Sequence, residues 1–174
     1  MGIVYLRYLL IFLFFVLGAI LQFNLGIAQA WYLYAGGVLL LLTQVLMGNV
    51  WTAHSLLKKG KALDAEKVLN QVWSPNWLLK RNQAYYYFTK GLIELQRKEL
   101  GPARRHLETA LALGMEHPND SALASLNLAH IHYVQQAFEP ARHWMEQAKS
   151  FPANDLLIKE NLDKLEQALA ARNN

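Results

Sequence analysis

Hydrophobic residues are distributed very unevenly along this chain. Residues 1–57 contain 41 hydrophobic residues and a single charged residue, Arg7, and the first acidic residue is Asp64. Beyond residue 57 the chain is about 44% hydrophobic and about 25% charged, the composition of an ordinary soluble domain. The pattern therefore divides the chain into an apolar first third and a soluble remainder.

The apolar third predicts two membrane-spanning helices. A helix needs about 20 apolar residues to cross a bilayer, and no charged residue occurs from Tyr8 to Leu57. We predict a transmembrane hairpin over residues 1–57, with spans at about 8–27 and 31–50 and a more polar turn between them. Because no proline lies between Trp31 and Lys59, we expect the second span to continue directly into the first soluble helix. Aromatic residues suited to the two membrane interfaces flank the second span: Trp31, Tyr32, Tyr34 and Trp51.

Small residues occur in both predicted spans. Gly18-Ala19 and Gly36-Gly37 could let two helices approach closely. Glycine is also common in membrane helices in general, and we interpret these residues in that ordinary sense. Neither span contains an acidic residue or a histidine, so the sequence predicts no ion pathway.

Basic residues flank the hairpin on one side only. Arg7 precedes the first span, and Lys58, Lys59 and Lys61 follow the second. The positive-inside rule places such residues in the cytoplasm. We therefore predict an integral protein of a bacterial-type cytoplasmic (inner) membrane, with its soluble domain facing the cytoplasm. The Ala28–Ala30 segment also resembles a signal-peptidase site, and cleavage after Ala30 would leave the second span and the same orientation.

An internal repeat organises the soluble part. Ala65, Ala103 and Ala141 are separated by intervals of 38 residues, and Gly91 and Ala129 each precede the next alanine by 12. Small residues at such positions let the two helices of a pair pack closely. Proline and glycine mark helix ends rather than strand turns, so we predict an all-α fold. The residues that define the repeat are Ala65, Leu69, Gly91, Ala103, Leu107, Ala110, Ala129, Ala141, Met145 and Ala148.

These residues resemble the tetratricopeptide repeat (TPR) family. The match is clearest over residues 87–110 and 128–152, and a degenerate first copy covers residues 53–72. The resemblance covers residues 47–152 and so overlaps the end of the second span, with a unit of 38 residues where the family usually has 34. It implies a short α-solenoid of about three helix pairs. An apolar stripe within residues 153–174 predicts a capping helix and a tail.

The resemblance also implies a function. In the family, first-helix residues on the concave face hold peptides or partner proteins. The residues that its carboxylate-binding form requires are absent here, so we do not expect recognition of a free C-terminus. The resemblance implies a membrane-anchored scaffold or adaptor for protein–protein interaction or complex assembly, whose protein partners can include membrane proteins. The matching concave-face positions are His54, Tyr85, Phe88, Leu92, Leu123, Asn127 and His130.

A second interpretation remains open from the sequence. The protein could be an accessory structural subunit of a membrane complex, held mainly through its transmembrane hairpin. In that case the repeats would only stabilise the assembly.

Motifs for chemistry are missing from the sequence. The chain has no cysteine, no His-Glu-x-x-His pair, no phosphate-binding glycine loop and no nucleophile elbow. His130 and His132 are two residues apart, which places them about 200° apart around a helix and unable to share a metal. Basic residues are interspersed with acidic ones instead of forming a stripe. We therefore expect no catalytic residue, cofactor, metal site or nucleic-acid partner.

Overall fold

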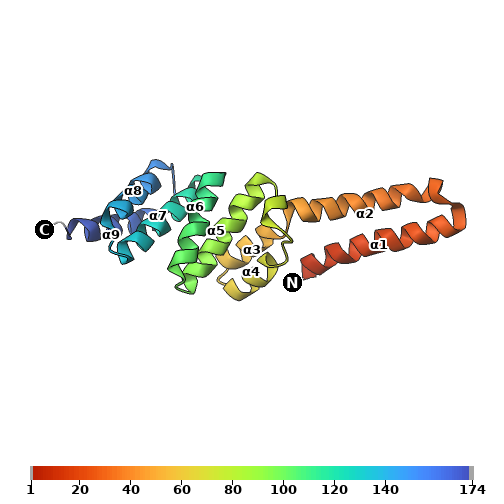
Figure 1. The fold of residues 1–174 in the computed structure, drawn as a ribbon, viewed down its shortest axis with the longest axis horizontal. Helices are drawn as coiled ribbons and strands as arrows, with labels where there is room; N and C mark the ends of the chain where they lie inside the picture. Colours follow the sequence, from red (N-terminus) through yellow and green to blue (C-terminus); the bar gives the residue numbers. More distant parts are fainter. Residues whose placement is uncertain (1, 173–174) are drawn as a thin grey trace.

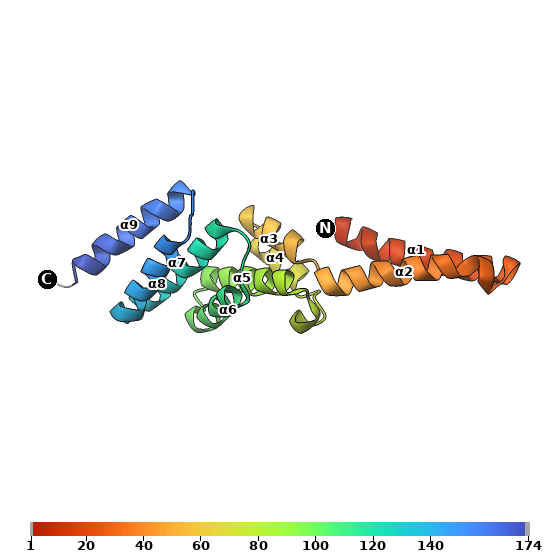
Figure 2. The same cartoon turned by 90° about the horizontal axis from the view of Figure 1, so that it is seen from above.

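Helices account for nearly the whole chain, as the sequence predicts. The computed structural model describes residues 2–172, except for the side chains of residues 2–5 and 7. That part forms nine α-helices and one short 3₁₀ helix without any strand, which confirms the all-α fold class. The molecule is elongated, with the α1–α2 hairpin at one end and α9 at the other (Figures 1 and 2). The helices are α1 (Gly2–Leu25), α2 (Ile27–Met47), α3 (Val50–Lys58), α4 (Ala62–Leu69), η1 (Pro75–Trp77), α5 (Lys80–Gln96), α6 (Leu100–Leu113), α7 (Pro118–Val134), α8 (Phe138–Ser150) and α9 (Leu156–Ala170).

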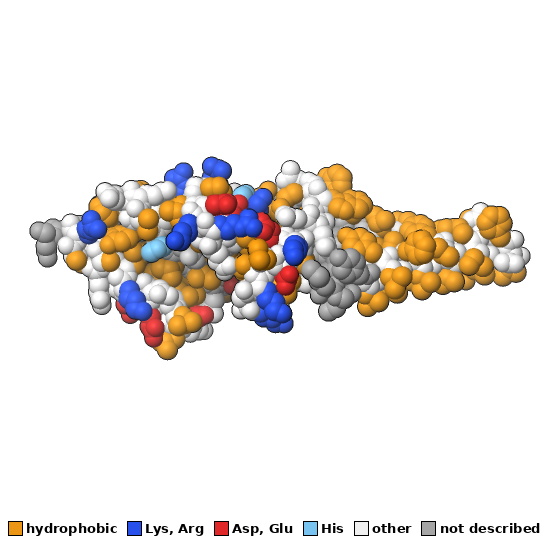
Figure 3. All heavy atoms as spheres, turned by 90° about the horizontal axis from the view of Figure 1, so that it is seen from below, with side chains coloured by type: hydrophobic (Ala, Val, Ile, Leu, Met, Phe, Trp, Pro, Cys, Tyr) orange, Lys and Arg blue, Asp and Glu red, His pale blue; other side chains and the backbone are white. Residues whose placement is uncertain are grey.

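The first two helices form an antiparallel hairpin. The segments Tyr8–Leu25 and Ile27–Met47 are long and apolar enough to cross a membrane, and only 6% and 11% of their residues are buried. A core helix of a soluble protein would be mostly buried, whereas apolar side chains cover the outside of this hairpin (Figure 3). The turn is tighter than predicted, because Gly26 alone separates the helices at a φ of +90°. Glycine tolerates that left-handed conformation without a steric cost.

Three glycines of the hairpin receive aromatic rings from the opposite helix. A Cβ atom added at Gly18 would lie 3.0 Å from the Tyr34 ring, and one at Gly36 would lie 2.7 Å from the Phe14 ring. Gly37 is equally crowded, by Phe15. The interpretation of these residues as ordinary membrane-helix glycines is therefore wrong, since a larger residue would push a ring out of the interface between α1 and α2.

The helix continuity predicted between the second span and the soluble part is also wrong. α2 ends at Met47 because Gly48 adopts a φ of +59°, and α3 begins at Val50. At this break Leu79 N–H donates to the Leu46 carbonyl in the last turn of α2 (2.9 Å), and Asn49 Nδ2 donates to Gln71 Oε1 (3.1 Å). The soluble helices are thus joined to the hairpin without an intervening linker.

Trp51, which is predicted to flank the second span, packs against side chains of α5. Its indole Nε1 donates a hydrogen bond to Asn82 Oδ1 (3.1 Å), and its ring lies 4.5 Å from the Tyr85 ring. The Arg81 guanidinium lies 5.0 Å from the same indole. Trp51 is therefore half-buried between α3 and α5, inside the soluble domain. The side chain of Arg7, the other predicted membrane-flanking group at this end, lies outside the described part of the chain.

Beyond the hairpin the helices form three consecutive antiparallel pairs, α3–α4, α5–α6 and α7–α8. The turns of these pairs place Gly60, Lys98 and Gln136 at φ values of 73°, 63° and 60°. In each turn the N–H of the following residue bonds to the carbonyl five positions earlier, at 2.9–3.0 Å. That closure satisfies the last carbonyls of the first helix. The three pairs therefore share one turn geometry, and their turn residues are again 38 positions apart.

All ten residues of the predicted repeat are buried. Ala65, Ala103 and Ala141 are completely inaccessible and lie where the second helix of each pair meets the first. The core forms two clusters, one centred on α3–α6 and the other on α7–α9. α9 closes the second cluster with Ile158, Leu162, Leu165 and Leu169, which share one face of that helix.

Candidate functional site

A groove follows one side of the helix pairs. Its inner hollow has a volume of about 360 Å³ and is lined by side chains of α3, α5 and α7. Its outer hollow, about 430 Å³, lies between α7 and α9. Leu123 and Asn127 of α7 line both hollows, so the two form one continuous surface depression.

The structure brings the predicted concave-face residues together, but at different depths. Five of them line the inner hollow: His54, Phe88, Leu92, Leu123 and Asn127. Leu92, Leu123 and Asn127 are half-buried, so they can contact a partner directly, whereas His54 and Phe88 are buried and form the floor.

The remaining two predicted residues lie apart from this inner set. His130 is exposed and lines the outer hollow. Tyr85 is completely buried beneath the groove, so the expectation that it faces a partner is corrected. It packs in the core with His54 and Phe88, at ring-centroid distances of 5.5 and 6.3 Å.

His54 carries an unpartnered polar atom at the floor of the inner hollow. Its Nδ1 lies 3.3 Å from Thr89 Oγ1, but its Nε2 is buried with no hydrogen-bond partner among the described residues. Burial, followed by the nearby Lys58 ammonium, lowers the pKa of His54 and keeps the imidazole neutral at pH 7. A neutral ring can donate or accept at Nε2, depending on its tautomer. Because buried polar atoms are nearly always paired, this atom has room for one more hydrogen bond, which no described side chain supplies.

A buried carboxylate closes one end of the inner hollow. Tyr85 Oη donates a hydrogen bond to Asp120 Oδ2 (2.9 Å), and Lys58 Nζ lies 3.8 Å from Asp120 Oδ1. Burial, followed by the bond to Asp120, raises the pKa of Tyr85, so the phenol keeps its proton. In the sequence, Lys58 is recognisable only as a membrane-flanking residue, and Asp120 is not recognisable as part of a site. Asp120 follows Pro118 and Asn119, a combination typical only of a helix start.

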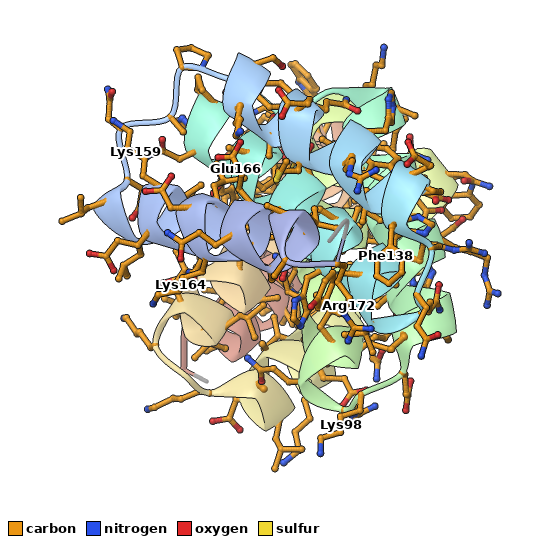
Figure 4. All side chains as sticks on the ribbon, turned by 90° about the vertical axis from the view of Figure 1, so that its left-hand side faces the viewer. Lys98, Phe138, Lys159, Lys164, Glu166 and Arg172 are labelled. Carbon is orange, nitrogen blue, oxygen red and sulfur yellow. The ribbon has the colours of Figure 1, made fainter. Side chains whose placement is uncertain are left out.

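Leucine side chains make the wall of the groove largely apolar. Leu57, Leu92 and Leu95 line the inner hollow, and Leu126 and Leu165 line the outer one. α9, expected only as a cap, adds Lys164, which projects from the helix at the C-terminal end of the molecule (Figure 4). An apolar concave surface with a few placed polar groups is typical of a binding site.

His106 and His132 do not line the inner hollow. His106 Nδ1 lies 2.6 Å from Glu94 Oε2, and its ring stacks on Tyr87 at 5.7 Å. His132 is buried on α7, and burial, followed by Arg104, lowers its pKa. Over residues 2–172 no three His, Cys, Asp or Glu side chains are grouped closely enough to hold a metal ion.

No protein-family model matches this chain, and neither do the curated proteins or the solved structures. The function therefore has to be inferred from the groove and the hairpin themselves.

Proposed function

We propose that this protein is a membrane-anchored adaptor of the TPR type. The α1–α2 hairpin holds it in a bacterial-type cytoplasmic membrane, and the helix pairs project into the cytoplasm. A segment of a partner protein binds in the groove along α3, α5, α7 and α9. The adaptor brings that partner to the membrane and carries out no chemistry of its own.

The repeated geometry of the helix pairs supports the family part of this proposal. The left-handed turn residues Gly60, Lys98 and Gln136 recur at the same interval as the buried alanines. A TPR solenoid requires such equivalence, because each pair must present the same faces to its neighbours. α9 then caps the stack by covering the apolar face of the last pair.

Three observations support the membrane part. The hairpin is apolar and exposed along its length. The 21 residues of Ile27–Met47 extend about 31 Å at 1.5 Å per residue, close to the hydrocarbon thickness of about 30 Å. Lys58, Lys59 and Lys61 follow within fifteen residues of the hairpin, near enough to determine orientation. Lys58 can do so even though it ends beside Asp120, because orientation is established during insertion.

The observation that carries the binding function is the groove itself, in which an apolar wall lies over a floor that includes His54 and Phe88. A partner segment that places an apolar side chain against Leu92, Leu95 and Leu123 would bury that side chain. The hollow of about 360 Å³ suits one or two side chains rather than a folded domain.

The groove is tested by introducing a charge at its apolar wall. The full chain is purified from detergent-solubilised membranes as the wild type, as Leu92→Glu and as Leu63→Glu. Leu63 is 70% exposed on α4 and makes the matched control. The partner should co-purify with the wild type and with Leu63→Glu, and its recovery should fall at least about tenfold with Leu92→Glu. Thermal unfolding must show that both variants are folded. The pair Tyr85→Ala and Phe88→Ala would not serve, because both side chains are core residues.

The alternative function, an accessory subunit held through its hairpin, makes the opposite prediction. Replacing residues 1–47 by an unrelated two-span anchor would then abolish co-purification, while Leu92→Glu would have no effect. That combination of results would contradict the groove proposal and favour the subunit interpretation.

A further inference from the structure

The loop between α4 and α5 carries two exposed tryptophans. Trp73 is 67% exposed and Trp77 is 57% exposed, and Leu79 at the end of the same loop is 51% exposed. Tryptophan is usually well buried in soluble domains. Trp51 and Trp144 of this protein are half-buried, whereas Trp73 and Trp77 are exposed. Clustered exposed apolar side chains of this size mark a contact surface.

This loop lies against the membrane-domain end of the molecule. Leu79 N–H bonds to the carbonyl of Leu46 in the last turn of α2, at 2.9 Å. Trp73 and Val72 share a small recess with Tyr8 of α1 and Gln44 of α2. Figures 1 and 2 both show the loop beside the end of α2. The loop is therefore level with the ends of both apolar segments.

Those ends mark the hydrocarbon boundary if the hairpin crosses a bilayer. Tyr8 is the first residue of the first apolar segment, and Met47 is the last residue of the second. The segment length matches the hydrocarbon thickness, so one boundary passes near Tyr8 and Met47. Residues packed on Gln44 and Leu46 then lie in the headgroup region. Trp73 and Trp77 then lie in the interfacial aromatic belt.

We propose that the loop over residues 71–79 is an interfacial anchor, with Trp73 and Trp77 inserted at the headgroup boundary of the bilayer that the hairpin crosses. The indole ring suits this zone because it is apolar over most of its surface and has one N–H donor. Lys80, exposed just after the loop, is placed to meet lipid phosphates. This inference rests on the membrane part of the proposed function and is independent of the groove.

The anchor gives the soluble domain a second attachment to the bilayer, beside its covalent link to α2. The end of α2 alone allows the stack of helix pairs to tilt about the break at Gly48. A loop fixed at the interface and hydrogen-bonded to Leu46 removes that freedom. The groove is then held at a constant height and direction relative to the membrane surface.

The test uses the full chain reconstituted in phosphatidylcholine vesicles. Tryptophan emission is compared between ordinary lipid and lipid brominated near the top of the acyl chains. The wild type, a Trp73→Phe/Trp77→Phe variant and a matched Trp144→Phe control are measured. Trp31, Trp73 and Trp77 are the three indoles expected at an interface, so the double variant should lose about two thirds of the bromine-quenchable emission. Trp144→Phe should lose none.

Two outcomes overturn the inference in distinguishable ways. If the protein floats with the vesicles but the quenchable emission is unchanged in the double variant, the loop is not at the interface, while the anchoring hairpin stands. If the protein does not float with the vesicles at all, the membrane part of the proposed function fails and the loop anchor fails with it. Far-UV circular dichroism of each variant checks that the helices are retained.

Discussion

Gly91 of α5 and Leu107 of α6 are in such close contact that a Cβ atom added to the glycine would lie 2.9 Å from Leu107 Cγ. The same atom would lie 3.3 Å from the Ala103 carbonyl oxygen. These residues form the crossing point of the middle helix pair, which packs against the pairs on both sides. The closeness of α5 and α6 is thus a requirement of the whole stack.

Replacing Gly91 by alanine should therefore destabilise the protein. Overpacking of this kind costs about 1–3 kcal/mol, and the better helix propensity of alanine returns about 1 kcal/mol. We expect a net loss of up to about 2 kcal/mol in the free energy of unfolding, measured by denaturant unfolding of the full chain in detergent. Gly101→Ala is the matched control, because no atom lies within 4 Å of the added Cβ. An equal effect of the two substitutions would show that the contact does not limit packing.

Substitution by glycine at two left-handed turn residues should stabilise the protein instead. Lys98 and Gln136 adopt φ values near +60°, a conformation that costs a residue with a Cβ about 1–2 kcal/mol. Glycine removes that cost but loses more chain entropy on folding. We expect Lys98→Gly and Gln136→Gly each to raise the free energy of unfolding by up to about 1 kcal/mol. Gly60→Ala, at the equivalent turn, should lower it by a similar amount. Thermal unfolding of the three variants tests this, and destabilisation by both glycine substitutions would contradict it.

The stability should fall as the pH drops below neutral. Burial lowers the pKa values of His54 and His132 below the 6.5 of an exposed histidine. Below that pH the unfolded chain binds protons that the native chain does not, so the free energy of unfolding increases with pH across this window. The contribution is complete above the unfolded pKa and is lost as the pH falls below it.

This prediction is checked by the denaturation midpoint between about pH 7.5 and pH 5. A His54→Asn/His132→Asn variant should show a flatter dependence than the wild type. His130→Asn is the control, because His130 is exposed on the same helix as His132. An unchanged slope in the double variant would assign the pH dependence to the carboxylates instead.

Local patterns in the sequence were enough to predict much of the architecture. Two long uncharged apolar segments predict two apolar helices, and the structure has α1 and α2 there. The alanines at intervals of 38 residues predicted close helix packing, and all three are inaccessible. The apolar helices can be predicted from the sequence because they depend on residues that are close together in the chain. The buried alanines can be predicted because their spacing repeats. The turn residues Lys98 and Gln136 share that spacing, but neither residue type signals a left-handed conformation.

The assignment of individual side chains to surfaces required the tertiary structure. Tyr85 and Phe88 occupy predicted contact positions on α5, yet neighbouring helices cover both completely. Trp51 follows the second apolar segment but packs on Asn82 and Tyr85, while Trp73 and Leu79 of a later loop lie beside the end of α2.

The sequence by itself thus determined the helices, their apolar or amphipathic character and the repeat. Only the tertiary structure decided which faces are covered, where α2 ends at Gly48, and which residues form the groove. The physical reason is that burial depends on contacts between residues far apart in the chain. A hydrophobic pattern specifies that a side chain needs a neighbour, but it does not specify which neighbour the fold supplies.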